Sequence, residues 1–156
     1  MRIEAFAIWS NGGQATLAIA GSNLTGVDTG AATSCGLAVR CSPQDDEHTL
    51  ILYDRDAGRI CIDREQSSLD PAVVRGGNGG SFALAAGEPL TLHVFIDRSI
   101  VEVYANGRAC LTERIYPSRP DSLGLDLVAR GGRATAVSID VWELSEAWEA
   151  GDVSGA

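Results

Sequence analysis

The sequence predicts an all-β protein, and three observations support this fold class. Apolar residues alternate with polar ones over many short stretches, and β-branched residues are enriched in those stretches. Turn-forming residues separate the stretches at intervals of roughly 8–12 residues. The chain contains 18 glycines and one Met in 156 residues, and no stretch has a convincing helical period. We therefore expect two packed antiparallel sheets rather than a helical or mixed fold.

The first part of the chain contains five expected strands. They are Arg2–Trp9, Gln14–Ala20, Cys35–Ser42, His48–Asp54 and Arg59–Asp63. Residues rich in Gly, Ser, Thr and Asp between Gly21 and Ser34 predict a long loop, and Pro43–Glu47 predicts an acidic turn. The last two strands form a hairpin across Asp56-Ala57-Gly58.

The strongest strand signal lies between Leu90 and Tyr116, where we expect three consecutive antiparallel strands. In the first hairpin, Ile96 is expected opposite Val101, because a slip of one residue would expose the apolar row. The same register places Glu102 opposite Phe95. Arg-Ser is not a favoured two-residue turn, so a four-residue loop that keeps this register is expected.

The second hairpin is predicted by Asn106-Gly107, whose residues both tolerate positive φ. With these as a two-residue turn, Glu102 faces Leu111 across the hairpin. The register of this central region therefore follows from its apolar row and its turns.

The remaining segments follow the same alternation of strand and turn. Glu65–Asn78 predicts a polar loop, Ser81–Ala85 a strand, and the prolines in Tyr116–Asp121 an extended loop; Leu123–Ala129 and Thr135–Leu144 are closing strands. The glycine pairs at Gly76, Gly79 and Gly131 predict turns rather than phosphate-binding loops. We expect one β-sandwich domain over residues 1–144, jelly-roll-like and of the concanavalin or lectin type, followed by a flexible acidic tail, 145–156.

Composition excludes several classes of partner and site. The net charge is −9 without any basic run, so neither nucleic acid nor an anionic membrane surface is an expected partner. No apolar run approaches the ~18 residues of a membrane span, and the N-terminus lacks the layout of a signal peptide. We expect a soluble chain, with export left open. Four cysteines without a C-x-x-C pair and two histidines predict no structural zinc, and no cofactor is implied.

Two carboxylates, Asp97 and Glu102, lie near the end of the central hairpin. Paired carboxylates suit a glycosidase acid and nucleophile, although strand-end carboxylates are more often solvated. Glu102 lies between apolar neighbours and needs partners, which Arg98 or Arg114 could supply as bidentate donors. Such a pair beside a tyrosine suits sugar hydroxyls, and a buried structural pair fits equally well.

Several segments together resemble a known family. FIDRSIVEVYANG, LTERIYPSRPDS, YDRDAGRICIDR and VSIDVWEL look like the C-terminal β-sandwich of glycoside hydrolase family 32, which includes invertases, levanases and inulinases. The resemblance runs from about Cys35 to Leu144, and the region before Gly30 matches only in its strand-like character. In that family a separate β-propeller carries the chemistry, in N-D-P-N, R-D-P and E-C motifs. This sequence lacks all three, so the resemblance implies no catalytic residue here.

The resemblance implies an accessory domain with two alternative roles. The sandwich either packs structurally on the catalytic β-propeller of a parent enzyme, or binds terminal fructose of levan, inulin or sucrose-like sugars, as in the similar carbohydrate-binding module family 66. A free-standing fructan-binding, lectin-like module is the alternative, and a stand-alone glycosidase is the least favoured. The candidate carbohydrate-binding residues are Asp97, Arg98, Glu102, Arg114 and Tyr116.

Overall fold

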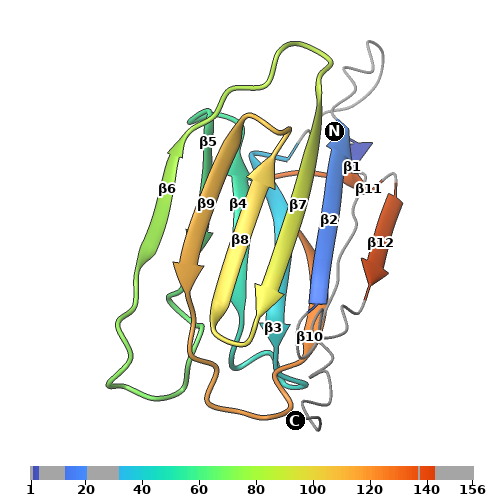
Figure 1. Cartoon of the computed structure of the whole chain (residues 1–156). Coiled ribbons are helices and arrows are strands. Elements are labelled where there is room, and N and C mark those ends of the chain that lie inside the picture. The colour runs from blue at the N-terminus through green and yellow to red at the C-terminus, as the bar shows by residue number, and fades with distance from the viewer. Residues whose placement is uncertain (1, 4–12, 21–31, 137, 143–156) are drawn as a thin grey trace, which may run out of the picture.

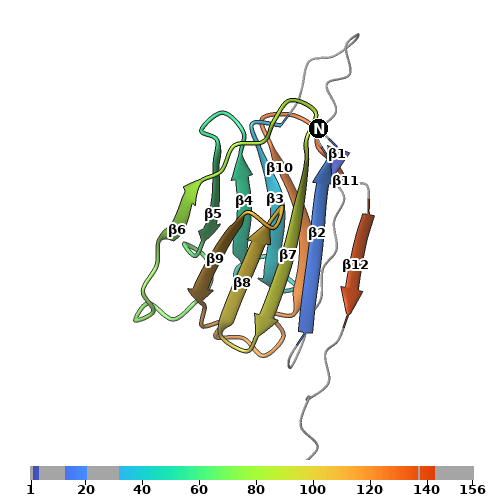
Figure 2. The same cartoon turned by 45° about the horizontal axis from the view of Figure 1, so that its top comes forward.

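The structure is a computed structural model that describes residues 2–3, 13–20, 32–136 and 138–142. The described residues contain no helix and form two five-stranded antiparallel sheets that face each other (Figures 1 and 2). The first sheet has the order β10 (Gly124–Arg130), β3 (Ser34–Cys41), β4 (Thr49–Asp54), β5 (Arg59–Asp63) and β6 (Gly77–Ser81). The second has the order β12 (Ser138–Trp142), β2 (Gly13–Ala20), β7 (Pro89–Asp97), β8 (Ile100–Ala105) and β9 (Ala109–Arg114).

The all-β sandwich predicted from the sequence is therefore confirmed. A short parallel pair, β1 (Arg2–Ile3) with β11 (Thr135–Ala136), accompanies the two sheets. The rest of the expected first strand and the expected tail, 145–156, lie outside the described residues.

The core lies between the two sheets and follows the alternation of the sequence. Leu37 and Ile62 of the first sheet, and Leu92 and Val94 of the second, are completely buried in one cluster. Each such side chain contributes about 1.5–3 kcal/mol when removed from water, so this cluster supplies most of the driving force for folding. Among the described residues, no disulfide and no group of side chains placed to hold a metal ion is found.

The register of the β7–β8 hairpin is as predicted. Ile96 pairs with Val101 and Phe95 with Glu102, so the apolar row faces the core. The expected four-residue loop is wrong, because only Arg98 and Ser99 separate the strands. Arg98 adopts φ +49°, which lets this uncommon pair form a tight turn.

The predicted register of the β8–β9 hairpin is wrong by one residue. Ala105 pairs with Ala109, so the loop contains three residues and Glu102 faces Thr112 instead of Leu111. Asn106 and Gly107 both have positive φ as expected, but the strands resume one residue later. The reason is the core, because this register sets partly buried Leu111 opposite buried Val103.

The expected strand Ser81–Ala85 is also wrong, since the strand at this edge is β6, Gly77–Ser81. Gly79 lies in this strand and not in a turn, and a Cβ atom there would come within 2.4 Å of the Ile60 carbonyl oxygen. The prediction relied on the strand propensity of the apolar residues around Phe82. In the structure, Phe82 is buried in the core although it does not belong to a strand. Close pairing with β5 selected the glycine-rich segment instead.

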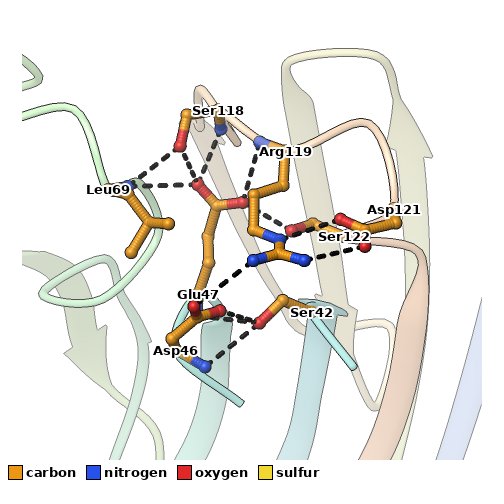
Figure 3. Close-up of polar contacts among 8 residues, drawn as sticks. All are labelled: Ser42, Asp46, Glu47, Leu69, Ser118, Arg119, Asp121 and Ser122. Atoms are coloured by element: carbon orange, nitrogen blue, oxygen red, sulfur yellow. Dashed lines mark hydrogen bonds and ion pairs between the residues drawn. The ribbon is translucent and has the colours of Figure 1, made fainter. Parts of the chain in front are cut away.

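A buried carboxylate anchors three segments at one end of the sandwich. Glu47 is 0% exposed, and its two oxygens accept five hydrogen bonds. One oxygen accepts from the backbone N–H of Leu69 (3.1 Å) and from the N–H (2.6 Å) and hydroxyl (2.7 Å) of Ser118. The other accepts from the N–H of Arg119 (3.1 Å) and from the Ser122 hydroxyl, as Figure 3 shows. The expected acidic turn at 43–47 thus contains a fully buried anchor.

These hydrogen bonds also determine the charge state of Glu47. Burial by itself raises the pKa of a carboxyl, but the hydrogen bonds from Ser122 and Ser118 and from the N–H of Arg119 outweigh it. The pKa of Glu47 therefore lies below its ordinary value, and the group is ionised at neutral pH.

We expect Gly36→Ala to destabilise the fold by about 3 kcal/mol, since overpacking a core has costs of this order. A Cβ atom at Gly36 would lie 1.8 Å from the Ile51 carbonyl oxygen of the neighbouring strand. The matched control is Gly80→Ala, because nothing lies within 4 Å of a Cβ atom there. Urea unfolding of both variants checks this, and equal midpoints would contradict the close β3–β4 approach.

We expect Glu47→Gln to lower the free energy of unfolding at pH 7 by about 3 kcal/mol, because an amide cannot accept all five donors. The folded pKa lies below the unfolded value of about 4.3, so the carboxylate stabilises fully above that pH. The difference from the unmodified chain should shrink as the pH falls below about 4.

Denaturant titrations from pH 7 to pH 3 measure this difference. Glu65→Gln, an exposed glutamate of the neighbouring loop, is the control and should behave like the unmodified chain. A pH-independent effect of Glu47→Gln would show that packing, not the carboxylate charge, anchors these segments.

Candidate functional site

An open pocket of about 280 Å³ lies at the same end of the sandwich as Glu47. The C-terminal end of β3, the β7–β8 turn and the segment after β9 meet there, at the lower end in Figure 1. We call it the end pocket; its lining residues are Arg40, Ile96, Arg98, Ser99, Ile115, Tyr116 and Pro117. Because the Glu47 anchor holds residues 118–122, it also positions the segment that carries Tyr116.

Arg40 reaches the end pocket because of a β-bulge. Gly124 pairs with Cys41 and Leu125 with Val39, so Arg40 is the extra residue on β3. It adopts φ +55°, an uncommon value for a residue with a side chain. Regular alternation would place Arg40 on the outer face with Ala38, but after the bulge Cys41 packs there instead. The bulge therefore turns the guanidinium toward the opposite sheet.

The Arg40 guanidinium is only partly satisfied. Its Nη2 donates to the carbonyl oxygen of Arg98 at 3.3 Å, whereas its buried Nε has no hydrogen-bond partner. Burial lowers the pKa of Arg40, and the nearby charge of Glu47 opposes this shift. Arginine nevertheless stays protonated in proteins, so the pocket contains a partly desolvated positive charge.

Three of the sequence-predicted site residues are brought together here. Arg98 is exposed at the turn and lines the pocket with Tyr116, whose side chain is 47% exposed. Arg114 donates from Nη2 to the Ser99 hydroxyl at 3.1 Å, and its Cζ lies 5.7 Å from the centre of the Tyr116 ring. An aromatic face, a hydroxyl and guanidinium donors thus converge on one open space.

The other two predicted residues, Asp97 and Glu102, are not among the lining residues of the end pocket. Both lie on the outer face of the β7–β8 hairpin, with Glu102 between Phe95 and Thr112. The expected partnership of Glu102 with Arg98 or Arg114 is not found among the described ion pairs and hydrogen bonds. The structure therefore places both carboxylates outside the end pocket, whereas Arg98 lines it. Arg114 pairs with Ile100 and so lies on the same outer face as Glu102, without a hydrogen bond or ion pair between them among the described contacts.

Glu102 instead belongs to a small polar group on the outer face. A hydrogen bond with Cys110, followed by the charges of Cys110 and Glu102, raises the pKa of Tyr104. Tyr104 also packs edge-on against Phe95, with ring centres 5.8 Å apart.

Sequence reasoning missed Arg40 and Glu47 as structural and site residues. The alternation of β3 predicts that Arg40 points outward. The bulge could not be predicted, because no glycine, the usual residue at such a position, occurs there. Glu47 sits in an acidic run, and its donors come from residues 69 and 118–122, far along the chain. One feature of the sequence could have indicated the role of Glu47. The two serines of the S-R-P-D-S segment have hydroxyls that can donate hydrogen bonds to a buried carboxylate.

Other chemistries find no support among the described residues. No group of three or more His, Cys, Asp or Glu side chains is placed to hold a metal ion there. None of the four cysteines forms a disulfide, and burial raises the pKa of the Cys35 and Cys41 thiols to about 12. Within the described ranges, no helix is long and apolar enough to cross a membrane.

The chain is similar in sequence to several enzymes that act on fructose-containing sugars. It is 32% identical over 126 residues to a sucrose-6-phosphate hydrolase of Zymomonas mobilis, covering 78% of this chain and 23% of the enzyme. It is 32% identical to a levanase of Bacillus subtilis, covering 78% of this chain and 18% of the enzyme. The chain thus spans about a fifth of the length of the curated relatives that it matches.

Solved structures share the fold. An exo-inulinase from Aspergillus awamori has a TM-score of 0.70 at 24% identity, covering 87% of this chain and 26% of the enzyme. A carbohydrate-binding module, CBM66, from Bacillus subtilis has a TM-score of 0.51 at 12% identity, covering 81% of this chain and 74% of the module.

The match to a family model extends further than the segments that carried the resemblance. Residues 4–143 match the model described as "Glycosyl hydrolases family 32 C terminal", which includes the region before Gly30. With this match over most of the chain and the sandwich fold in place, the chain belongs to the C-terminal domain family of the family 32 glycosyl hydrolases.

Proposed function

We propose that this domain is a non-catalytic accessory module that binds the fructose ends of sugars such as levan, inulin or sucrose at the end pocket. The observation that carries the proposal is that Tyr116 and Arg98 line one open pocket of a family 32 C-terminal domain, with Arg114 against the Tyr116 ring. The relatives named levanase and exo-inulinase support the choice of fructans as ligands.

The geometry of the end pocket suits a sugar ring. The exposed Tyr116 offers an aromatic surface, and the guanidiniums offer planar sets of donors to ring hydroxyls. The Ser99 hydroxyl adds a group that can donate or accept. Because the site is open, we expect weak binding with a dissociation constant of about 1 mM, equivalent to about −4 kcal/mol.

The same proposal gives the domain no hydrolytic activity by itself. The matching enzymes are about five times longer than the matched region, and the family is described by its position at the C-terminus. The catalytic β-propeller domain of a parent enzyme is therefore the proposed partner, with the end pocket holding a fructan near it. The purified chain should release no fructose from sucrose or levan.

Packing on the parent enzyme is the second candidate function. On the outer face of β8, Ile100 and Tyr104 are each 37% exposed, and a partner domain could cover them. In this case the domain stabilises the enzyme and the end pocket has no ligand.

We expect Tyr116→Ala to weaken binding of levan by about fivefold, because an aromatic contact of this kind contributes roughly 1 kcal/mol. Calorimetric titration with fructose, levan and inulin measures the affinity. Tyr104→Ala is the matched control, because Tyr104 is also an exposed tyrosine but lies on the outer face of β8.

Glu102→Ala distinguishes the two faces of the β7–β8 hairpin. If the end pocket is the site, this variant binds levan like the unmodified chain. Loss of binding in Glu102→Ala or Tyr104→Ala, with Tyr116→Ala unaffected, would place the ligand on the outer face. Absence of binding to all three sugars would leave the packing function.

A further inference from the structure

The end pocket has an unusual balance of charge for a neutral sugar. Its lining contains two arginines and no carboxylate, and Arg114 approaches it through Ser99 and Tyr116. Within the part of the chain that the structure describes, none of these three guanidiniums forms an ion pair. Positive charge thus collects here on a chain whose net charge is −9.

The charged side chains that line the end pocket, Arg40 and Arg98, are donors only. Arg40 Nε is buried without a partner, and the Arg98 guanidinium is exposed. The carbonyl oxygen of Arg98, a possible acceptor, is already bonded to Arg40. A neutral sugar presents hydroxyls that must donate as well as accept, whereas an anion only accepts. The pocket therefore matches an anion better than a neutral polyol.

Glu47 does not neutralise this charge, although its negative charge lies close enough to affect the pKa of Arg40. Its carboxylate is occupied by five donors from Leu69, Ser118, Arg119 and Ser122, none of them a guanidinium. Partly buried charges in proteins are normally paired, because removing them from water is costly. Arg40 is thus left without a bonded counter-ion.

The backbone at Arg40 adds an independent observation. An arginine in the left-handed region is strained by roughly 1–2 kcal/mol relative to glycine, and such strain is found mainly where function requires it. The strained bulge has one evident consequence, which is to turn the guanidinium from the outer face into the pocket.

We propose that the end pocket binds the anionic group of a sugar, a phosphate or a carboxylate, and that Arg40 is its main contact. Arg98 and Arg114 then approach the same group or the ring beside it. Guanidinium forks bind both kinds of anion bidentately, so geometry alone admits either source. The inference rests on the proposed function only for the sugar part of the ligand.

Two matched pairs of sugars test this inference by calorimetric titration at low ionic strength. Fructose 6-phosphate differs from fructose by a phosphate, and glucuronate differs from glucose by a carboxylate in place of the terminal hydroxymethyl group. At least one anionic sugar should bind about tenfold more tightly than its neutral counterpart. The pair that shows this preference identifies the anion.

Arg40→Gly should abolish the preference while the chain remains folded, because glycine adopts φ +55° without strain. Circular dichroism verifies the fold. Arg59→Ala is the control: it removes a different arginine, which is exposed at the start of β5 and at the opposite end of the sandwich, and should leave the preference unchanged. If both variants lose the preference for the anionic sugar equally, the chain attracts anions without a specific site, and the inference is overturned.

The outcomes distinguish this inference from the proposed function. Equal affinity for charged and neutral sugars would overturn the anion site and leave sugar binding intact. Binding of inorganic phosphate and the charged sugars, with none of fructose or levan, would support the anion site and overturn fructan binding. If none of these ligands binds, both the anion site and fructan binding are overturned.

Discussion

The end of the sandwich that carries the candidate site depends on the buried carboxylate of Glu47. Three segments without regular structure meet there: the turn that carries Glu47, the loop at Leu69 and residues 118–122, and the latter two donate five hydrogen bonds to its carboxylate (Figure 3). A buried charge is tolerated only when its hydrogen-bonding capacity is satisfied, so the three segments and the carboxylate must assemble together. The polar anchor therefore determines loop positions that apolar packing of the strands leaves open.

The end pocket is the structural consequence of this anchor and of one irregularity in β3. The anchor holds residues 118–122, and Tyr116 and Pro117 lie immediately before them. The bulge at Arg40 supplies the pocket's guanidinium from the opposite sheet. The hydrogen-bonded carboxylate of Glu47 thus positions the side of the pocket formed by Tyr116 and Pro117. The strained backbone at Arg40 positions the side formed by its guanidinium.

The two hairpins show how far a sequence pattern can be trusted. The β7–β8 register was predictable because any slip exposes the apolar row around Val101. The β8–β9 register was wrong by one residue, because Asn106-Gly107 fits a two-residue and a three-residue loop equally well. Packing of Leu111 decided between them. The edge strand at Gly79 was missed for a related reason, since only close pairing makes glycine a suitable strand residue.

By itself, the sequence determined the all-β sandwich, most strand positions, the family resemblance and part of the candidate site, namely Arg98, Arg114 and Tyr116. These features depend on alternation and turn residues, which act over a few neighbouring positions. Only the tertiary structure decided that Glu102 lies outside the end pocket, that Glu47 anchors the loops and that Arg40 enters the pocket. The reason is physical: these contacts join residues 22 to 75 positions apart, or follow from a bulge, and local pattern encodes neither.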